Sequence, residues 1–187
     1  KMITFVSFIW GGSLLFSISQ FFDSLVIAAV LKNGLALTGI YSLAQNISSL
    51  IQAPQRGILS ASVGPLSQAW KDKNLEKIKT IYHRSSINQI VFSIGMFVLL
   101  WLNFEDGVAT FHLQSGYLDA KIIFLFIGLM RIIDMGTGLN GQIIATSTYW
   151  RVDFLTGIFL IVITLPLNYL LTKTMGMVGP AIANLIS

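Results

Sequence analysis

The sequence predicts an all-α membrane protein, a polytopic helical bundle with five complete transmembrane helices and the start of a sixth. Of its 187 residues, 54% are hydrophobic and only 11% are charged, whereas about 25% are charged in an ordinary soluble domain. The hydrophobic residues form continuous runs long enough for transmembrane helices, without the alternation that is typical of membrane strands. A water-soluble globular domain is therefore ruled out. The chain has no cysteine, which excludes disulfides and thiolate metal sites.

The predicted spans follow the apolar runs and cover residues 5–31, 37–66, 82–102, 117–144, 154–171 and 177 onward. Tyrosine and tryptophan side chains prefer the headgroup layer, and eight of them lie at or near the predicted span ends: Tyr41, Trp70, Tyr82, Trp101, Tyr117, Tyr149, Trp150 and Tyr169. Three prolines inside spans predict kinks, because each removes a backbone hydrogen bond; they are Pro54, Pro65 and Pro166. The chain begins at Lys1 without a Met and stops inside an apolar run, so we expect a fragment of a longer protein.

Lysine and arginine predict the orientation. If the spans alternate, one side holds Lys1, Lys71, Lys73, Lys77, Lys79, Arg84 and Arg151, and the other side holds only Lys32, Lys121 and Lys173. The first side is expected to be cytoplasmic, since cytoplasmic loops carry an excess of Lys and Arg. The net charge of +4 therefore reports where the loops lie, and no nucleic-acid partner is expected.

Residues 67–82 predict a cytoplasmic amphipathic connector. Leu75, Ile78, Ile81 and Tyr82 are expected to share one helical face, with lysines and Asp72 on the rest. Such a helix is typical of the membrane interface, so we expect it to lie on the inner leaflet. A solvated linker between two spans is the alternative.

Motifs for catalysis are absent from the sequence. His83 and His112 both lie near predicted span ends, and there is no His-x-x-x-His pair, nucleophile elbow or phosphate loop. The two histidines are interpreted as interfacial polar residues. We therefore expect no enzyme activity, no catalytic residue, no metal site and no cofactor.

Polar residues inside the second span form a stripe. Ser42, Gln45, Ser49, Gln52 and Arg56 recur at intervals of three and four, which places them on one helical face. An arginine near the bilayer centre costs about 2.5–3.5 kcal/mol on insertion scales, so Arg56 is expected to face water, a carboxylate or an anionic ligand. The alternative is that the stripe only forms hydrogen bonds between helices.

Two further spans contain charged residues. Arg131 and Asp134 are neighbours on one face of the fourth span, where they form either a local ion pair or part of a cavity that attracts a phosphate or acidic sugar. Asp23 lies in the first span beside a polar face formed by Ser13, Ser17, Gln20 and Ser24. It is a candidate cation or proton site, and a plain hydrogen bond to a neighbouring helix is the alternative. The candidate substrate-cavity residues are thus Gln45, Ser49, Gln52, Arg56, Arg131 and Asp134, with Asp23 for ion coupling.

Three passages resemble the second half of polysaccharide exporters. They are Gly39-Ile40-Tyr41-Ser42-Leu43-Ala44, then Pro166-Leu167-Asn168-Tyr169-Leu170, and Gly176-Met177-Val178-Gly179-Pro180-Ala181-Ile182-Ala183. With an Asp in the first helix, they are similar to the lipid-linked oligosaccharide flippase branch of the multidrug, oligosaccharidyl-lipid and polysaccharide exporter superfamily. Pro180 departs from that pattern, which has Ala at this position.

The resemblance implies a transporter of two helical bundles, of which residues 1–187 would be the C-terminal half, helices seven to twelve. It implies alternating access in a bacterial inner membrane, crossed several times, and a polyprenyl-diphosphate-linked oligosaccharide for cell-surface polysaccharide as the substrate. Expected partners are that substrate, membrane lipids, the missing N-terminal half and a coupling proton or sodium ion. The alternatives are efflux of drugs or organic cations by a related exporter, and a membrane-embedded transferase for lipid-linked sugars.

Overall fold

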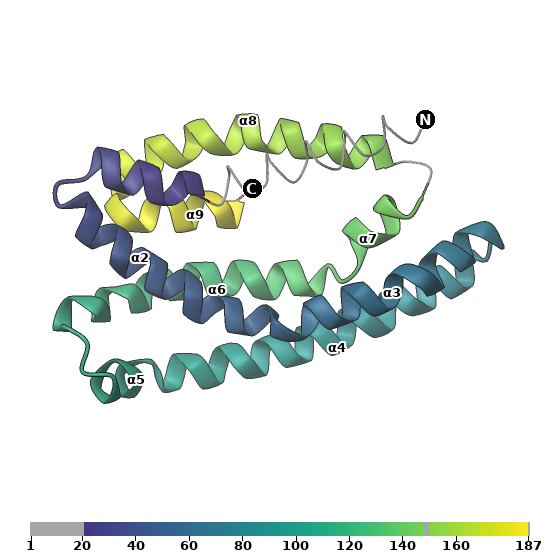
Figure 1. Ribbon diagram of the computed structural model, residues 1–187, viewed down its shortest axis with the longest axis horizontal. Coiled ribbons are helices and arrows are strands. Elements are labelled where there is room, and N and C mark those ends of the chain that lie inside the picture. Colours follow the sequence, from purple (N-terminus) through teal and green to yellow (C-terminus); the bar gives the residue numbers. More distant parts are fainter. Residues whose placement is uncertain (1–20, 148–149, 187) are drawn as a thin grey trace. The chain divides into compact units, whose positions relative to one another are not determined.

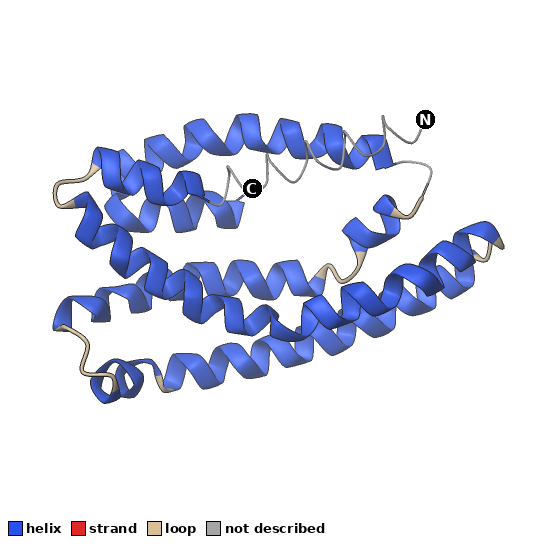
Figure 2. Ribbon diagram, in the orientation of Figure 1, coloured by secondary structure: helices blue, strands red, loops and turns tan. Residues whose placement is uncertain are grey.

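A computed structural model describes residues 21–147 and 150–186. Side chains are described for all of these residues except 150–154. Every regular element in these ranges is helical, and the described part of the chain contains no strand, so the fold is all-α (Figures 1 and 2). Short loops join the helices. The chain divides into two compact units, a central unit of residues 43–150 and a terminal unit that combines residues 1–42 with residues 151–187.

The central unit begins within α2 (Gly34–Ser49). A short 3-10 turn η1 (Leu50–Gln52) follows, then α3 (Ala53–Lys71), α4 (Leu75–Leu102), α5 (Phe104–Thr110), η2 (Ser115–Asp119), α6 (Ala120–Gly136) and α7 (Asn140–Ala145). The terminal unit contains a helix at Phe21–Val30, the first residues of α2, and then α8 (Trp150–Met175), η3 (Gly176–Val178) and α9 (Gly179–Ile186).

Helices α3 and α4 form an antiparallel hairpin in the central unit (Figure 1). Lys73 turns the chain with a left-handed backbone, φ 53°. The Asn74 side chain caps α4 by accepting a hydrogen bond from the Lys77 backbone N–H, 2.9 Å away. Next to the turn, Ile78 of α4 packs with Leu66 and Ala69 of α3. The hairpin is therefore fixed both by its cap and by a small apolar core.

The predicted connector at 67–82 is not a separate element. Its residues belong to the end of α3, a turn, and the first two turns of α4. Ile78 is buried against α3, whereas Leu75 is 65% exposed. Of the apolar face expected for this segment, Ile78 therefore covers the neighbouring helix and Leu75 does not. Its location on the inner leaflet stays a prediction.

Helix α6 packs along α4 through small and aromatic residues. A Cβ at Gly128 would lie 2.5 Å from the Phe97 ring of α4, so a larger residue would require this ring to shift. Phe97 stacks on Phe124 with ring centroids 5.4 Å apart, and Trp101 joins the same stack. Small residues at such crossings are typical of membrane helix packing.

Two predicted spans are interrupted. The span at 37–66 is broken at η1, because Pro54 lies at the start of α3 and has no N–H to continue the hydrogen bonds of α2. The span at 117–144 ends its regular helix at Gly136 and turns at Gly138, which has φ +67°. The α-helix continues without interruption through Pro65 in α3 and through Pro166 in α8.

Two helical stretches are long and apolar enough to cross a membrane by length and composition. They are Leu75–Leu102, which is α4, and Leu155–Ile186, which covers most of α8 and continues through α9. Many of their apolar side chains are exposed, including Val91, Leu102 and Phe159. This composition favours a membrane location.

Candidate functional site

The Asp23 carboxylate is buried in the terminal unit, and its side chain is only 4% exposed. It accepts hydrogen bonds from three side chains: the Tyr41 hydroxyl at 2.9 Å, the Asn184 amide at 2.6 Å, and the Asn168 amide. These donors lie on α2, α9 and α8 respectively. Asp23 is therefore the one acceptor that joins four separate helical segments of the described terminal unit.

A second layer of hydrogen bonds holds Asn168 in place. Thr172, one turn further along α8, donates to the Asn168 backbone oxygen at 2.7 Å and lies 3.2 Å from its side-chain oxygen. Asn168 is 1% exposed and Thr172 is fully buried. Because Thr172 contacts the amide oxygen of Asn168, the favoured rotamer of Asn168 is the one in which its amide nitrogen points at Asp23.

The surroundings of Asp23 set its chemistry. An ionised carboxylate accepts up to about four hydrogen bonds, and burying one without donors costs several kcal/mol. Three donors compensate that loss of water here. The carboxylate and the Tyr41 hydroxyl supply oxygen, the atom type that hard cations prefer, whereas both amides present their nitrogen to Asp23. A carboxylate is also a site for a proton.

A second polar cluster lies in the central unit around Asp134. Gln52 donates from its amide nitrogen to the Asp134 carboxylate at 2.7 Å, and Gln55 lies 3.5 Å from the same oxygen. The two glutamines come from η1 and α3, and Asp134 comes from α6. The interruption at η1 therefore places two glutamines beside a carboxylate that is 79 and 82 residues away in sequence.

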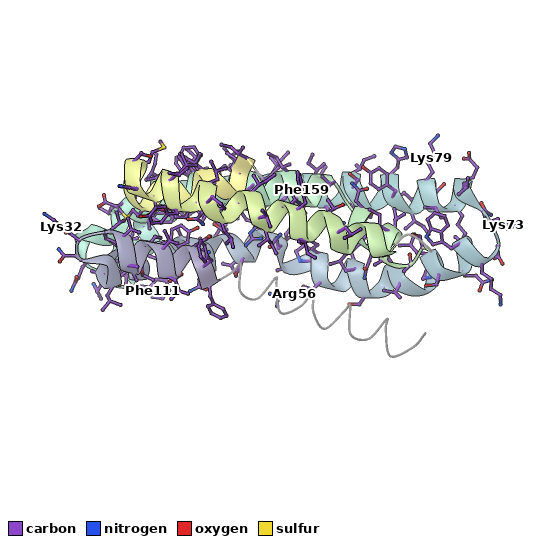
Figure 3. All side chains as sticks on the ribbon, turned by 90° about the horizontal axis from the view of Figure 1, so that it is seen from above. Lys32, Arg56, Lys73, Lys79, Phe111 and Phe159 are labelled. Carbon is purple, nitrogen blue, oxygen red and sulfur yellow. The ribbon has the colours of Figure 1, made fainter. Side chains whose placement is uncertain are left out.

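The other predicted cavity residues are more dispersed. Arg131 is partly buried one turn before Asp134 on α6, and Gln45 is partly buried on α2. Ser49 is exposed and donates to the Asn46 backbone oxygen at 2.6 Å. Arg56 is exposed on α3 (Figure 3). The structure thus brings Gln52 and Asp134 into contact and shows no such contact for Gln45, Ser49 or Arg56.

Sequence reasoning missed most partners of Asp23. Tyr41 was placed in the headgroup layer, but it is fully buried and donates to Asp23. Asn168 stood within one of the passages that carry the family resemblance, yet no role followed for it, and Thr172, Asn184 and Gln55 were not singled out. A search for polar residues within apolar runs finds Asn168 and Thr172, which are four residues apart on one face of α8.

Some predicted features lie outside the described residues, namely Ser13, Ser17, Gln20 and Tyr149. Among the described residues, no group of three or more His, Cys, Asp or Glu side chains is arranged to hold a metal ion. Comparison of the chain with protein-family models, curated proteins and solved structures found no match.

Proposed function

We propose that the chain is the C-terminal bundle of an exporter that flips polyprenyl-diphosphate-linked oligosaccharide across the bacterial inner membrane by alternating access. The observation that supports transport is Asp23, a buried carboxylate held by side chains from three other helical segments of an apolar chain. Ionisable residues inside membrane helices are rare and mark ion or substrate pathways. The proposal includes five complete transmembrane spans, and it includes the cytoplasmic side that the loop charges predict.

Asp23 is the proposed coupling site. Binding of a proton or sodium ion there would neutralise the carboxylate and change its hydrogen bonds to α2, α8 and α9. Because all three contacts converge on one side chain, a single ion would alter the packing of several helices together. That is the physical requirement for an ion gradient to drive a change between inward-open and outward-open states.

The polar cluster of the central unit is the proposed contact for the head group. Arg131 and Arg56 carry the positive charge that a diphosphate or acidic sugar requires, and arginine binds phosphate oxygens through two parallel hydrogen bonds. Gln52, held by Asp134, adds an amide that can bind sugar hydroxyls. Efflux of organic cations would instead favour acidic residues without these arginines.

The experiment is a deletion of the gene in the source bacterium, followed by mass spectrometry of extracted membrane lipids. Accumulation of polyprenyl-diphosphate-linked oligosaccharide is expected, with reversal by the wild-type gene but not by Arg131→Ala. Arg131→Lys should restore export partly, because it keeps the charge but loses the bidentate geometry. Lys173→Ala, an exposed cation in the last turn of α8, is the control and should restore export fully.

Absence of lipid-linked oligosaccharide in the deletion strain would overturn the assigned substrate. In that case, increased sensitivity of the strain to cationic dyes would favour drug or organic-cation efflux.

A further inference from the structure

The tip of the α3–α4 hairpin, residues 68–84, carries an unusual concentration of positive charge. It contains five cations against two carboxylates, Asp72 and Glu76, and all five cations are exposed: Lys71, Lys73, Lys77, Lys79 and Arg84. Within the described part of the chain, none of the five forms an ion pair. Both oxygens of Asp72 accept from the Gln68 amide at 2.9 Å. This surface is called the basic tip below.

The length of α4 places the basic tip at the edge of a membrane. A hydrocarbon core about 30 Å thick needs about 20 helical residues, and α4 has 28. If Leu102 marks one boundary, the first eight residues of α4 extend about 12 Å beyond the other. Arg84 then lies near the boundary, and Lys77 and Lys79 lie roughly 7–10 Å further out.

The basic tip is held rigidly. The Asn74 cap fixes the start of α4, and Ile78 is buried against α3. The indole N–H of Trp70 donates to the Ile143 backbone oxygen at 3.1 Å, which ties the end of α3 to α7. The lysines are therefore carried on a preorganised support, and their binding does not require ordering of a loop.

The opposite end of the central unit has the reverse charge. Residues 103–119 contain three carboxylates, Glu105, Asp106 and Asp119, and no lysine or arginine. The nearby Lys121 is paired with Glu105 at 2.6 Å. Within the central unit, Figure 3 shows Lys73 and Lys79 on one side of the view and Phe111, in the acidic segment, toward the opposite side. Of these two ends of the central unit, the tip is therefore the one that attracts an anionic surface.

We propose that the basic tip binds anionic phospholipid headgroups. The distribution of the cations around the hairpin favours lipid over a folded acidic protein as the ligand. Lys77 and Lys79 flank the buried Ile78 at about 100° on either side, and Lys71 lies on the neighbouring helix. Positive charge therefore surrounds the hairpin, as a headgroup layer would, whereas a folded protein would contact one face. Clusters of four to eight Lys and Arg beside a membrane span are typical of anionic lipid binding.

The test uses the intact protein purified in detergent, with phosphatidylglycerol or phosphatidylcholine added and lipid retention measured by native mass spectrometry. The variant is K77Q/K79Q. The matched control is K32Q/K173Q, which removes two exposed lysines of the terminal unit. Wild type is expected to retain phosphatidylglycerol in preference to phosphatidylcholine. K77Q/K79Q should weaken this binding roughly fivefold per cation removed, and K77R/K79R should restore it.

Several results would overturn the proposal. One is retention of phosphatidylglycerol by K77Q/K79Q at the wild-type level, as expected if the tip bound an acidic protein instead. A second is an equal loss of phosphatidylglycerol binding in K77Q/K79Q and in K32Q/K173Q. A third is equal retention of phosphatidylglycerol and phosphatidylcholine by wild type. Melting temperatures without lipid monitor folding, and K71Q/K73Q is a second pair that tests the same surface if K77Q/K79Q is unstable. The outcome is independent of the transported substrate.

Discussion

The Tyr41 hydroxyl donates a hydrogen bond to the Asp23 carboxylate, with 2.9 Å between Oη and Oδ2, and both side chains are buried. The two residues are 18 apart in sequence and lie on successive helices that are joined by a short turn. A phenol is a strong donor, and its ring fills space that water would otherwise need to occupy around the carboxylate. This contact therefore stabilises Asp23 and excludes water from it at the same time.

Tyr41→Phe is expected to lower the free energy of unfolding in mixed micelles by about 1.5–3 kcal/mol, because it removes one donor to a buried charged group. Tyr169→Phe is the matched control, since that ring is 47% exposed, and it should change stability by less than about 0.5 kcal/mol. Equal effects of the two substitutions would show that the Tyr41 hydroxyl contributes nothing specific to the site.

Gly179→Ala is expected to displace α9 from α8. A Cβ at this position would overlap the backbone carbonyl of Leu171, which cannot rotate away. Because α9 carries Asn184, the displacement should also weaken its hydrogen bond to Asp23. We expect a loss of about 1–3 kcal/mol in unfolding free energy, measured by denaturation in micelles. Gly157→Ala, with open space around its Cβ position, should be neutral or slightly stabilising. Destabilisation by both variants to the same degree would contradict the close packing of α9.

Gln52 and Asp134 are expected to be energetically coupled. A double-mutant cycle with Gln52→Ala and Asp134→Ala should give a coupling free energy of about 1 kcal/mol, since the 2.7 Å hydrogen bond is lost in either single variant. The same cycle with Gln45→Ala in place of Gln52→Ala should be additive within about 0.5 kcal/mol. Additivity in the Gln52 cycle would mean that the contact does not stabilise the central unit.

The all-α fold followed from composition, but the helix boundaries depended on local chemistry that hydropathy does not record. Apolar runs at 37–66 and 117–144 predict continuous spans, yet Pro54 interrupts the first and the turn at Gly138 ends the second. Pro65 and Pro166 show that a proline alone does not decide the outcome, since the helix continues through both.

Asp23 could be identified from sequence because a carboxylate within an apolar run requires a partner. Its partners could not, because Asn168 and Asn184 are 145 and 161 residues away and meet it only through tertiary packing. Tyr41 was misplaced for a related reason. Residue type and position near a span end favour the headgroup layer, and only the packed structure shows that its ring is turned inward.

Asp23→Asn tests most directly the proposal that Asp23 couples an ion gradient to transport. The intact protein would be reconstituted in proteoliposomes, and flipping of lipid-linked oligosaccharide would be measured with and without a proton or sodium gradient. The amide keeps the shape of the side chain but removes its charge. We expect the variant to be expressed, to be less stable than wild type because one acceptor oxygen becomes a donor facing other donors, and to lose gradient-driven flipping. Gradient-driven flipping at the wild-type rate in Asp23→Asn would contradict the account.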